Sequence, residues 1–259
     1  SRTSTVFPAK KMLRFKLTIA YDGTRYFGWQ VQKGRMTVQQ RVEEALRELF
    51  PSVKRVHSSS RTDTGVHALG MVVHVDIPVA ECRMDTRKLL LAVNSFLPVD
   101  IRIVAAKRVK EDFHARFDAK RKQYLYLIWN HAAMNPLLLN RAWHVSVPLD
   151  LDRMQKAAKL FVGKKDFKSF ASTHEYEMES TVRRITRCDV RKEGFTWKII
   201  IEGEGFLYKM CRGIVGTLER VGQGKMTQAN IRRIFRERDR RVAGMNAPAR
   251  GLTLWRVYY

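Results

Sequence analysis

The sequence predicts an α+β fold of two ferredoxin-like (RRM-like) domains, with mixed, mainly antiparallel sheets and a central basic cleft. Over the first 110 residues, apolar residues follow strand or helix spacing in the order strand, helix, strand, strand, helix, strand. A second alternation follows, and 259 residues are enough for two cores. We therefore expect a basic tail over residues 1–12, one domain over 13–113 and another over 114–259.

The N-terminal domain is predicted to begin with a strand over residues 14–20, where apolar and polar residues alternate before a turn at Asp22-Gly23. Thr37 is suited to cap the next helix, whose apolar residues recur at helical spacing until Pro51 ends it. The remaining periodicities predict a strand over 71–75, a helix over 85–97 and a strand over 101–109.

The C-terminal domain is predicted to begin with a strand over residues 124–129, because this run is rich in aromatic and branched apolar residues. Two further extended runs flank Gly194 and predict a hairpin. The other predicted elements are a helix over 151–161, hairpin strands over 183–190 and 195–202, helices over 215–221 and 231–238, and a closing strand over 252–258.

The charge of the chain predicts a polyanionic partner. Lys and Arg number 49 against 25 Asp and Glu, a formal net charge of +24. Basic proteins bind nucleic acid by displacing counterions from its phosphates; the alternative is a surface that is merely basic. Candidate phosphate contacts lie in four clusters: residues 120–122, 164–168, 183–187 and 232–241. Such contacts position RNA without reading its sequence.

Other residue patterns argue against metal, disulfide and membrane chemistry. Cys82, Cys188 and Cys211 lie far apart without Cys-x-x-Cys spacing, which favours a reducing compartment, and the histidines show no metal-ligand spacing. No apolar run approaches the roughly 18 residues that a membrane helix requires, and the first residues of the sequence lack the apolar segment of a secretory signal, so we expect none. We expect a cytoplasmic protein, or an organelle-matrix protein if residues 1–12 are a transit-peptide remnant.

One acidic residue, Asp63, lies in a polar loop that runs from Ser58 to Ala68 between two apolar stretches. Arg61, Thr62 and His67 are donors that can hold an ionised carboxylate, as a nucleophilic or electrostatic role requires. The alternative is structural, because Asp followed closely by Gly is common in turns.

A second alternative is an aspartic protease, because Asp63-Thr64-Gly65 is the tripeptide of that class. The chain has only one such tripeptide, and Ser58-Ser59-Ser60-Arg61 precedes it where an apolar strand is expected. A short motif outside its structural context is weak support, so we do not favour this class.

Several separated motifs carry a resemblance that covers the chain from about Leu13 to Tyr258. They are, in order, Tyr21-Asp22-Gly23, Phe27-Gly28-Trp29-Gln30, residues 61–68, Asp112-Phe113-His114-Ala115-Arg116-Phe117, Tyr124-Leu125-Tyr126, residues 166–170, residues 206–210 with Arg212, and Ala247-Pro248-Ala249 before Gly251-Leu252. With these motifs the chain resembles the TruA-type tRNA pseudouridine synthases. The resemblance implies isomerisation of uridine to pseudouridine in the tRNA anticodon stem-loop, typically at positions 38–40, in a central basic active-site cleft, with no cofactor and no metal.

The resemblance also assigns roles to five residues. Asp63 matches the essential aspartate, as nucleophile, and Arg212 matches the basic residue that pairs with it. Tyr124 matches the tyrosine that stacks on the target base, and Leu252 matches an apolar position of the uracil pocket. Arg61 would assist extrusion of the uridine. Whether the carboxylate attacks the base, attacks the sugar or removes a sugar proton stays open.

The residues alone leave simpler readings of these positions open. Tyr124 and Tyr126 share strand parity, so periodicity cannot tell a stacking residue from a core residue. The resemblance further implies a homodimer, in which one tRNA would touch both subunits. The competing class is a catalytically idle RNA-binding or RNA-chaperone protein, which would keep the charge but would not require Asp63, Tyr124 and Arg212 together.

Overall fold

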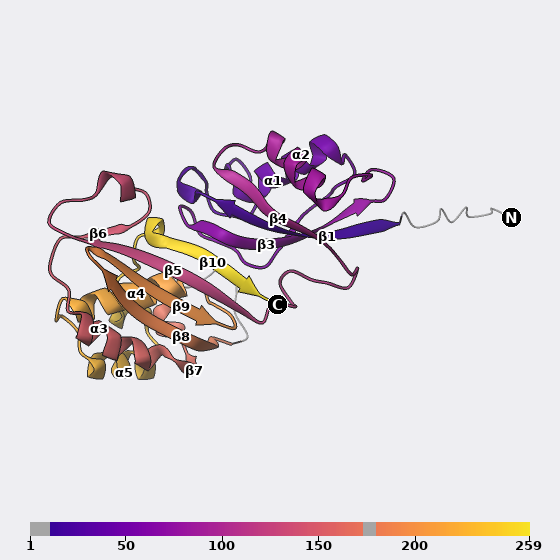
Figure 1. Ribbon diagram of the computed structural model, residues 1–259. Helices are drawn as coiled ribbons and strands as arrows, with labels where there is room; N and C mark the ends of the chain where they lie inside the picture. The colour runs from indigo at the N-terminus through magenta and orange to yellow at the C-terminus, as the bar shows by residue number, and fades with distance from the viewer. Residues whose placement is uncertain (1–10, 173–179) are drawn as a thin grey trace.

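The computed structural model describes residues 11–172 and 180–259 (Figure 1). The strands are β1 (Met12–Tyr21), β2 (His57–Ser58), β3 (His67–Pro78), β4 (Ile101–Val109), β5 (Arg121–Asn130), β6 (Trp143–Val145), β7 (Gly163–Asp166), β8 (Val182–Glu193), β9 (Thr196–Gly203) and β10 (Leu252–Tyr258). The α-helices are α1 (Val38–Leu49), α2 (Thr86–Phe96), α3 (Leu151–Ala158), α4 (Met210–Gly222) and α5 (Gln228–Glu237).

The described strands form one ten-stranded sheet in the order β4-β1-β3-β10-β5-β9-β8-β7, with β2 beside β3 and β6 beside β5. Only the pairs β10/β3 and β5/β6 are parallel among the described strands. The predicted mixture of helices with mainly antiparallel strands is therefore confirmed. The division into two ferredoxin-like domains at residue 113 stays a prediction, because the sheet is continuous through both halves of the chain.

The C-terminal strand β10 joins the halves by lying between β3 and β5 (Figure 1). Gly70 of β3 permits this close approach, since a Cβ atom at that position would lie 2.5 Å from the carbonyl oxygen of Trp255. The last strand of the sequence thus brings the loop before β3 next to the residues of β5.

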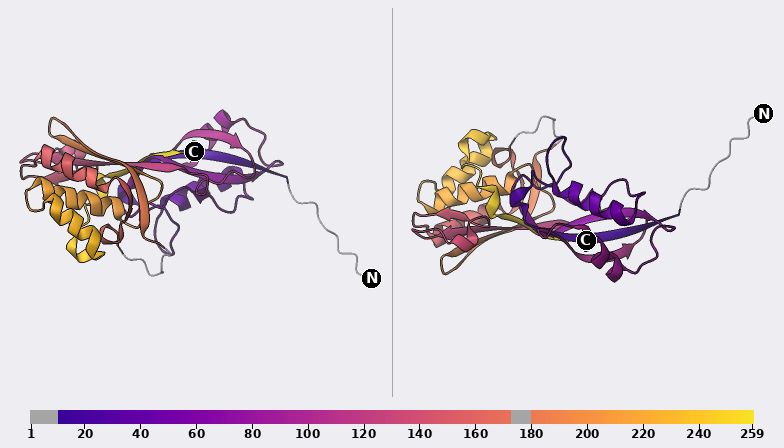
Figure 2. Two further views of the ribbon diagram at one scale, coloured as in Figure 1. Left: turned by 90° about the horizontal axis from the view of Figure 1, so that it is seen from below. Right: turned by 90° about the horizontal axis from the view of Figure 1, so that it is seen from above.

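The helices of the second half, α3, α4 and α5, lie together on one side of the sheet, which Figure 2 shows nearly edge-on. In α4 every residue is buried except Arg212 and Arg220. Helix α4 therefore belongs to the hydrophobic core, and Arg212 is one of its two residues that are partly exposed.

The sequence located most elements but placed some boundaries differently. The strands over 101–109 and 252–258 have the predicted bounds, and α1 and α2 lie within a residue of theirs at each end. Helix α4 begins at Met210 rather than at residue 215, because burial on all sides removes the apolar periodicity that marks a helix. The short strands β6 and β7 were not predicted.

Thr37 occupies the N-cap position of α1, but its buried hydroxyl has no hydrogen-bond partner among the described residues. The prediction of a side-chain cap is wrong at this point. The N–H groups of Val38 and Gln39 instead donate to the backbone carbonyls of Gly28 and Trp29, so neighbouring backbone performs the capping.

In the two described ranges, no helix has both the length and the apolar character needed to cross a membrane.

Candidate active site

The loop that carries Asp63, residues 59–66, connects β2 to β3 and is called the catalytic loop below. Its backbone packs against the segment that follows β1: the N–H of Trp29 donates to the Thr62 carbonyl at 3.1 Å. Gly28 has a φ of 79°, and a Cβ there would lie 2.6 Å from that same oxygen. The Thr62 hydroxyl shares a 2.6 Å hydrogen bond with Tyr21. These contacts fix the position of Thr62, the residue that directly precedes Asp63 in the loop.

A tight turn sets the direction of the Asp63 side chain. The N–H of Val66 donates to the Asp63 carbonyl at 3.1 Å, and Gly65 has a φ of 80°, which favours glycine. This is the turn chemistry that the Asp-x-Gly pattern predicts. It directs the carboxylate toward α4 rather than back onto its own loop.

Asp63 meets Arg212 of α4. The Arg212 Nη1 atom lies 3.1 Å from Asp63 Oδ2, and the two side chains are 18% and 14% exposed for Asp63 and Arg212. The Arg212 Nε atom also donates to the Ala247 carbonyl at 2.7 Å, while the Ala247 N–H donates to the Arg212 carbonyl. A guanidinium that is itself held by several hydrogen bonds orients a carboxylate better than a mobile guanidinium does. The sequence-predicted pair thus lies in direct contact.

Tyr124 of β5 lies beside this pair and is 7% exposed. Its ring meets Phe206 edge-to-face at 5.0 Å. Burial strongly raises the pKa of its phenol, and the nearby Cys211 and Asp63 act in the same direction. Its hydroxyl therefore stays protonated and can serve as a donor.

The neighbouring aromatic residue on the same face, Tyr126, has a structural environment. Its hydroxyl donates to the Pro248 carbonyl at 2.7 Å, and Gly251 packs directly on its ring. Leu252 is buried and pairs with Tyr126 across β5 and β10. Arg61 is an exposed residue of the catalytic loop. The structure thus gathers Asp63, Arg212 and Tyr124, with Leu252 one strand away and Arg61 at the surface.

His67 is a buried structural residue. Its Nδ1 accepts the Gly23 N–H at 3.0 Å, and its Nε2 lies 2.8 Å from the Asn140 carbonyl and 3.1 Å from that of Arg250. Two carbonyl acceptors at Nε2 require the proton on that atom. The ring therefore ties three segments together at the start of β3.

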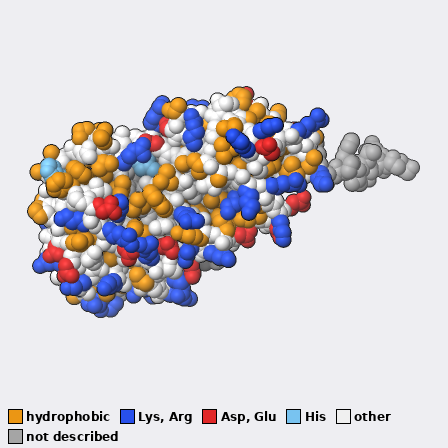
Figure 3. All heavy atoms as spheres, in the orientation of Figure 1, with side chains coloured by type: hydrophobic (Ala, Val, Ile, Leu, Met, Phe, Trp, Pro, Cys, Tyr) orange, Lys and Arg blue, Asp and Glu red, His pale blue; other side chains and the backbone are white. Residues whose placement is uncertain are grey.

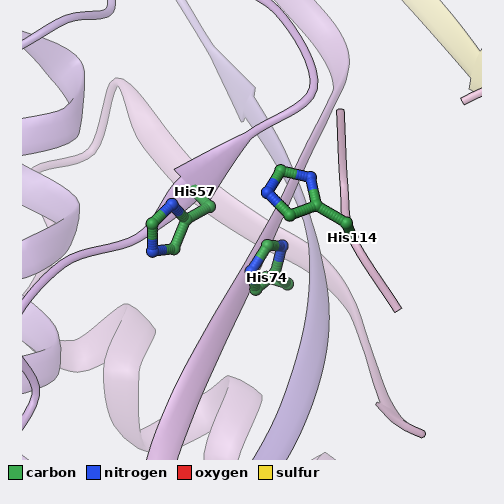
Figure 4. Close-up of side chains that lie close together, drawn as sticks. All are labelled: His57, His74 and His114. Atoms are coloured by element: carbon green, nitrogen blue, oxygen red, sulfur yellow. The ribbon is translucent and has the colours of Figure 1, made fainter. Parts of the chain in front are cut away.

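Three other histidines, His57, His74 and His114, form a cluster that the sequence did not predict (Figure 4). Their potential ligand atoms lie within 4.8 Å of one another. The Nδ1 atoms of His74 and His114 accept backbone N–H groups, of Ala115 and Arg116 respectively. Their Nε2 atoms then carry the protons, whereas a metal-binding histidine donates from its other nitrogen. The donor pattern does not fit a metal ion.

This histidine cluster contributes to packing between the sheet and the linker after β4. Burial, and next the charge of Arg14, lower the pKa of His74 to about 4. The rings of His57 and His74 stack with their centroids 4.8 Å apart, and the His114 ring meets the His74 ring edge-on at 4.6 Å. Sequence spacing missed the cluster because strand pairing of β2 with β3 brings the first two rings together.

The face of the molecule shown in Figure 3 is rich in basic side chains. Lys and Arg side chains are spread over both halves of the face in Figure 3 and outnumber Asp and Glu there. One pocket of about 650 Å³ lies between α1 and the end of α2 and is lined by residues such as Tyr26, Met36 and Phe96. This pocket is separate from Asp63, and the predicted central cleft stays a prediction.

Comparisons with known proteins agree with the motifs. Residues 17–118 and 157–259 match the family model described as tRNA pseudouridine synthase. The chain is 43% identical over 248 residues to a protein of Geobacillus kaustophilus named tRNA pseudouridine synthase A, covering 95% of this chain and 94% of the relative. It is 44% identical over 248 residues to a protein of the same name from Acetivibrio thermocellus, covering 96% and 100%.

Proposed function

We propose, from the premise that this chain belongs to the tRNA pseudouridine synthase family, that it converts uridine to pseudouridine in the anticodon stem-loop, at positions 38–40. The proposal further assigns the chemistry to a single carboxylate, Asp63, with no cofactor. The observation that carries it is the contact of Asp63 with Arg212 across 149 residues of sequence.

The chemistry requires one well-placed carboxylate. The bond between uracil and ribose must break, the base must turn, and a carbon–carbon bond must form, so a nucleophile that holds the intermediate lowers the barrier. Arg212 contacts Oδ2 of Asp63, which leaves Oδ1 for substrate in our proposal. The nearby guanidinium orients the carboxylate through a charge-assisted hydrogen bond.

The neighbouring residues then divide the work of binding. Tyr124 stacks on the uracil, Leu252 lines the pocket for the base, and Arg61 assists extrusion of the uridine from the stem-loop. The exposure of the Arg61 side chain supports that role, since extrusion happens at the surface. The net charge of +24 supports binding of tRNA, and we propose a homodimer in the cytoplasm.

The decisive experiment uses unmodified tRNA and chemical mapping of pseudouridine. Asp63→Asn should bind tRNA as wild type does, yet make less than about a thousandth of the product, because the amide cannot act as a nucleophile. Asp152→Asn on α3 is the matched control and should be fully active, since within residues 11–172 and 180–259 Asp152 forms an ion pair only with exposed Lys156. Equal turnover by Asp63→Asn would remove this residue from the reaction.

A second substrate separates the position of modification from the chemistry. A tRNA with cytidine at positions 38–40 should give no pseudouridine. Product elsewhere in that tRNA would leave the enzyme class intact and overturn the anticodon assignment. Binding without product from either tRNA would favour the idle RNA-binding alternative.

A further inference from the structure

Lys122 of β5 lies on the same face of the strand as Tyr124 and Tyr126, because successive residues of one face are two apart. Its Nζ atom donates to the backbone carbonyl of Ser59 at 2.5 Å. Ser59 is the first residue of the catalytic loop, four residues before Asp63. The strand that carries Tyr124 therefore also holds the loop that carries Asp63.

This contact crosses the sheet. Strand β10 separates β5 from β3, and Lys122 reaches past it to the segment that pairs with β3. On its other side Ser59 is fixed to β3, because its N–H donates to the Val72 carbonyl at 2.8 Å and its hydroxyl lies 3.4 Å from the Val72 nitrogen. The Ser59 backbone thus links β3, in the first half of the sheet, to β5, in the second half.

The environment of Lys122 is unusual for a lysine. Burial, and next the charge of Arg116, lower the pKa of its ammonium group to about 8. Among the described residues, no carboxylate lies within ion-pair distance of the Lys122 ammonium group. The nearby Glu202 forms its ion pair with Arg121. Burying an ammonium group without a counter-ion costs free energy that an apolar side chain of similar length would avoid.

We propose that Lys122 is a positioning residue, which holds the catalytic loop against β5 so that Asp63 and Tyr124 keep the separation that the uridine must fit. This inference rests on the proposed function. It explains why this partly buried charge has no carboxylate partner among the described residues: the ammonium makes a charge-assisted hydrogen bond to a carbonyl, which is stronger and shorter than a neutral one.

The first test is Lys122→Met, which keeps the length of the side chain and removes its donors. The kcat should fall about 100-fold, the scale expected when catalytic groups are slightly misplaced, while tRNA affinity changes little. Lys225→Met is the control and should keep the wild-type kcat, since Lys225 is exposed and lies outside the four basic clusters. If Lys122 served only as a phosphate contact, Lys122→Met would instead weaken tRNA binding and lower its salt dependence with kcat unchanged, and that outcome would overturn the proposal.

The second test is the dependence of kcat on pH. If Lys122 had a purely structural role, its titration would leave this dependence unchanged. The folded pKa lies below the ordinary value of 10.5, so the ammonium is complete near neutral pH and is lost as the pH rises through about 8. The kcat of wild type should fall over this range, whereas Lys122→Arg should stay flat because arginine keeps its charge. The nearby Arg116 is also permanently charged, and Tyr259, whose pKa burial raises, does not titrate there.

Wild-type activity separates failure of this inference from failure of the proposed function. If wild type makes no pseudouridine, the proposed function fails. If wild type is active and Lys122→Met keeps its kcat, only the positioning role fails. Should Lys122→Met not fold, Lys122→Arg and the wild-type pH profile decide, and identical profiles for these two proteins would overturn the role.

Discussion

Arg212 and Tyr124 show what residue-level patterns can and cannot predict. Periodicity puts Tyr124 and Tyr126 on one strand face, and only their partners distinguish them: Tyr126 donates to Pro248, whereas Tyr124 lies beside Asp63. Arg212 could be matched by its motif but not by spacing, because 149 residues separate it from Asp63. Lys122 was grouped with surface phosphate contacts, since a sequence does not reveal that a lysine is partly buried.

Substitution of Arg212 tests the ion pair itself. Arg212→Ala should lower kcat at least 100-fold, because a partly buried carboxylate then lacks its counter-ion and its orientation. Arg212→Lys should recover part of the loss, since lysine restores the charge but not the fork that reaches both Asp63 and Ala247. Single-turnover rates at saturating enzyme would measure both. Arg220→Ala, two turns along α4, should be unaffected; an equal loss there would mean that any charge on α4 matters.

At the scale of elements, several strands were predicted closely and the helix that is buried on nearly all sides less well. Strands β4 and β10 have the predicted bounds. Helix α4 begins five residues before the predicted start, and those five residues include Arg212. A helix that is buried on nearly all sides lacks the polar face that defines its ends.

The position of α4 depends on Gly213, next to Arg212. A Cβ at this position would lie 2.1 Å from the Phe170 carbonyl oxygen, so Gly213→Ala must shift the helix and with it the guanidinium. We expect a loss of about 1–3 kcal/mol of folding stability together with reduced kcat. Gly205→Ala is the control, since its Cβ would meet Arg183 at an ordinary 3.6 Å. Urea unfolding and turnover measure both effects, and an unchanged Gly213→Ala would show that α4 does not fix Arg212.

For the whole molecule, composition predicted the kind of partner but not the continuity of the sheet. Strand β10 inserts between β3 and β5. More than 180 residues of sequence separate the paired residues of β10 and β3, and no local sequence pattern encodes this pairing. It makes the site a product of both halves: the catalytic loop comes from one, and Tyr124, Lys122 and Arg212 come from the other.

The charge of the whole molecule predicts the salt dependence of tRNA binding. If the basic clusters contact phosphates, the logarithm of the binding constant should fall linearly with the logarithm of salt concentration, by about 0.7–0.9 per contact. Arg232 and Arg236 are exposed on α5, so the double substitution Arg232→Ala/Arg236→Ala should lower that slope by roughly 1.4–1.8. Lys156→Ala should leave it unchanged, because Lys156 pairs with Asp152 at 2.7 Å. Titrations at several salt concentrations measure the slope. If the α5 variant kept the wild-type slope, the bound tRNA would lie away from α5. Because α3, α4 and α5 share one side of the sheet, the tRNA would then contact the basic clusters near β5 and β8.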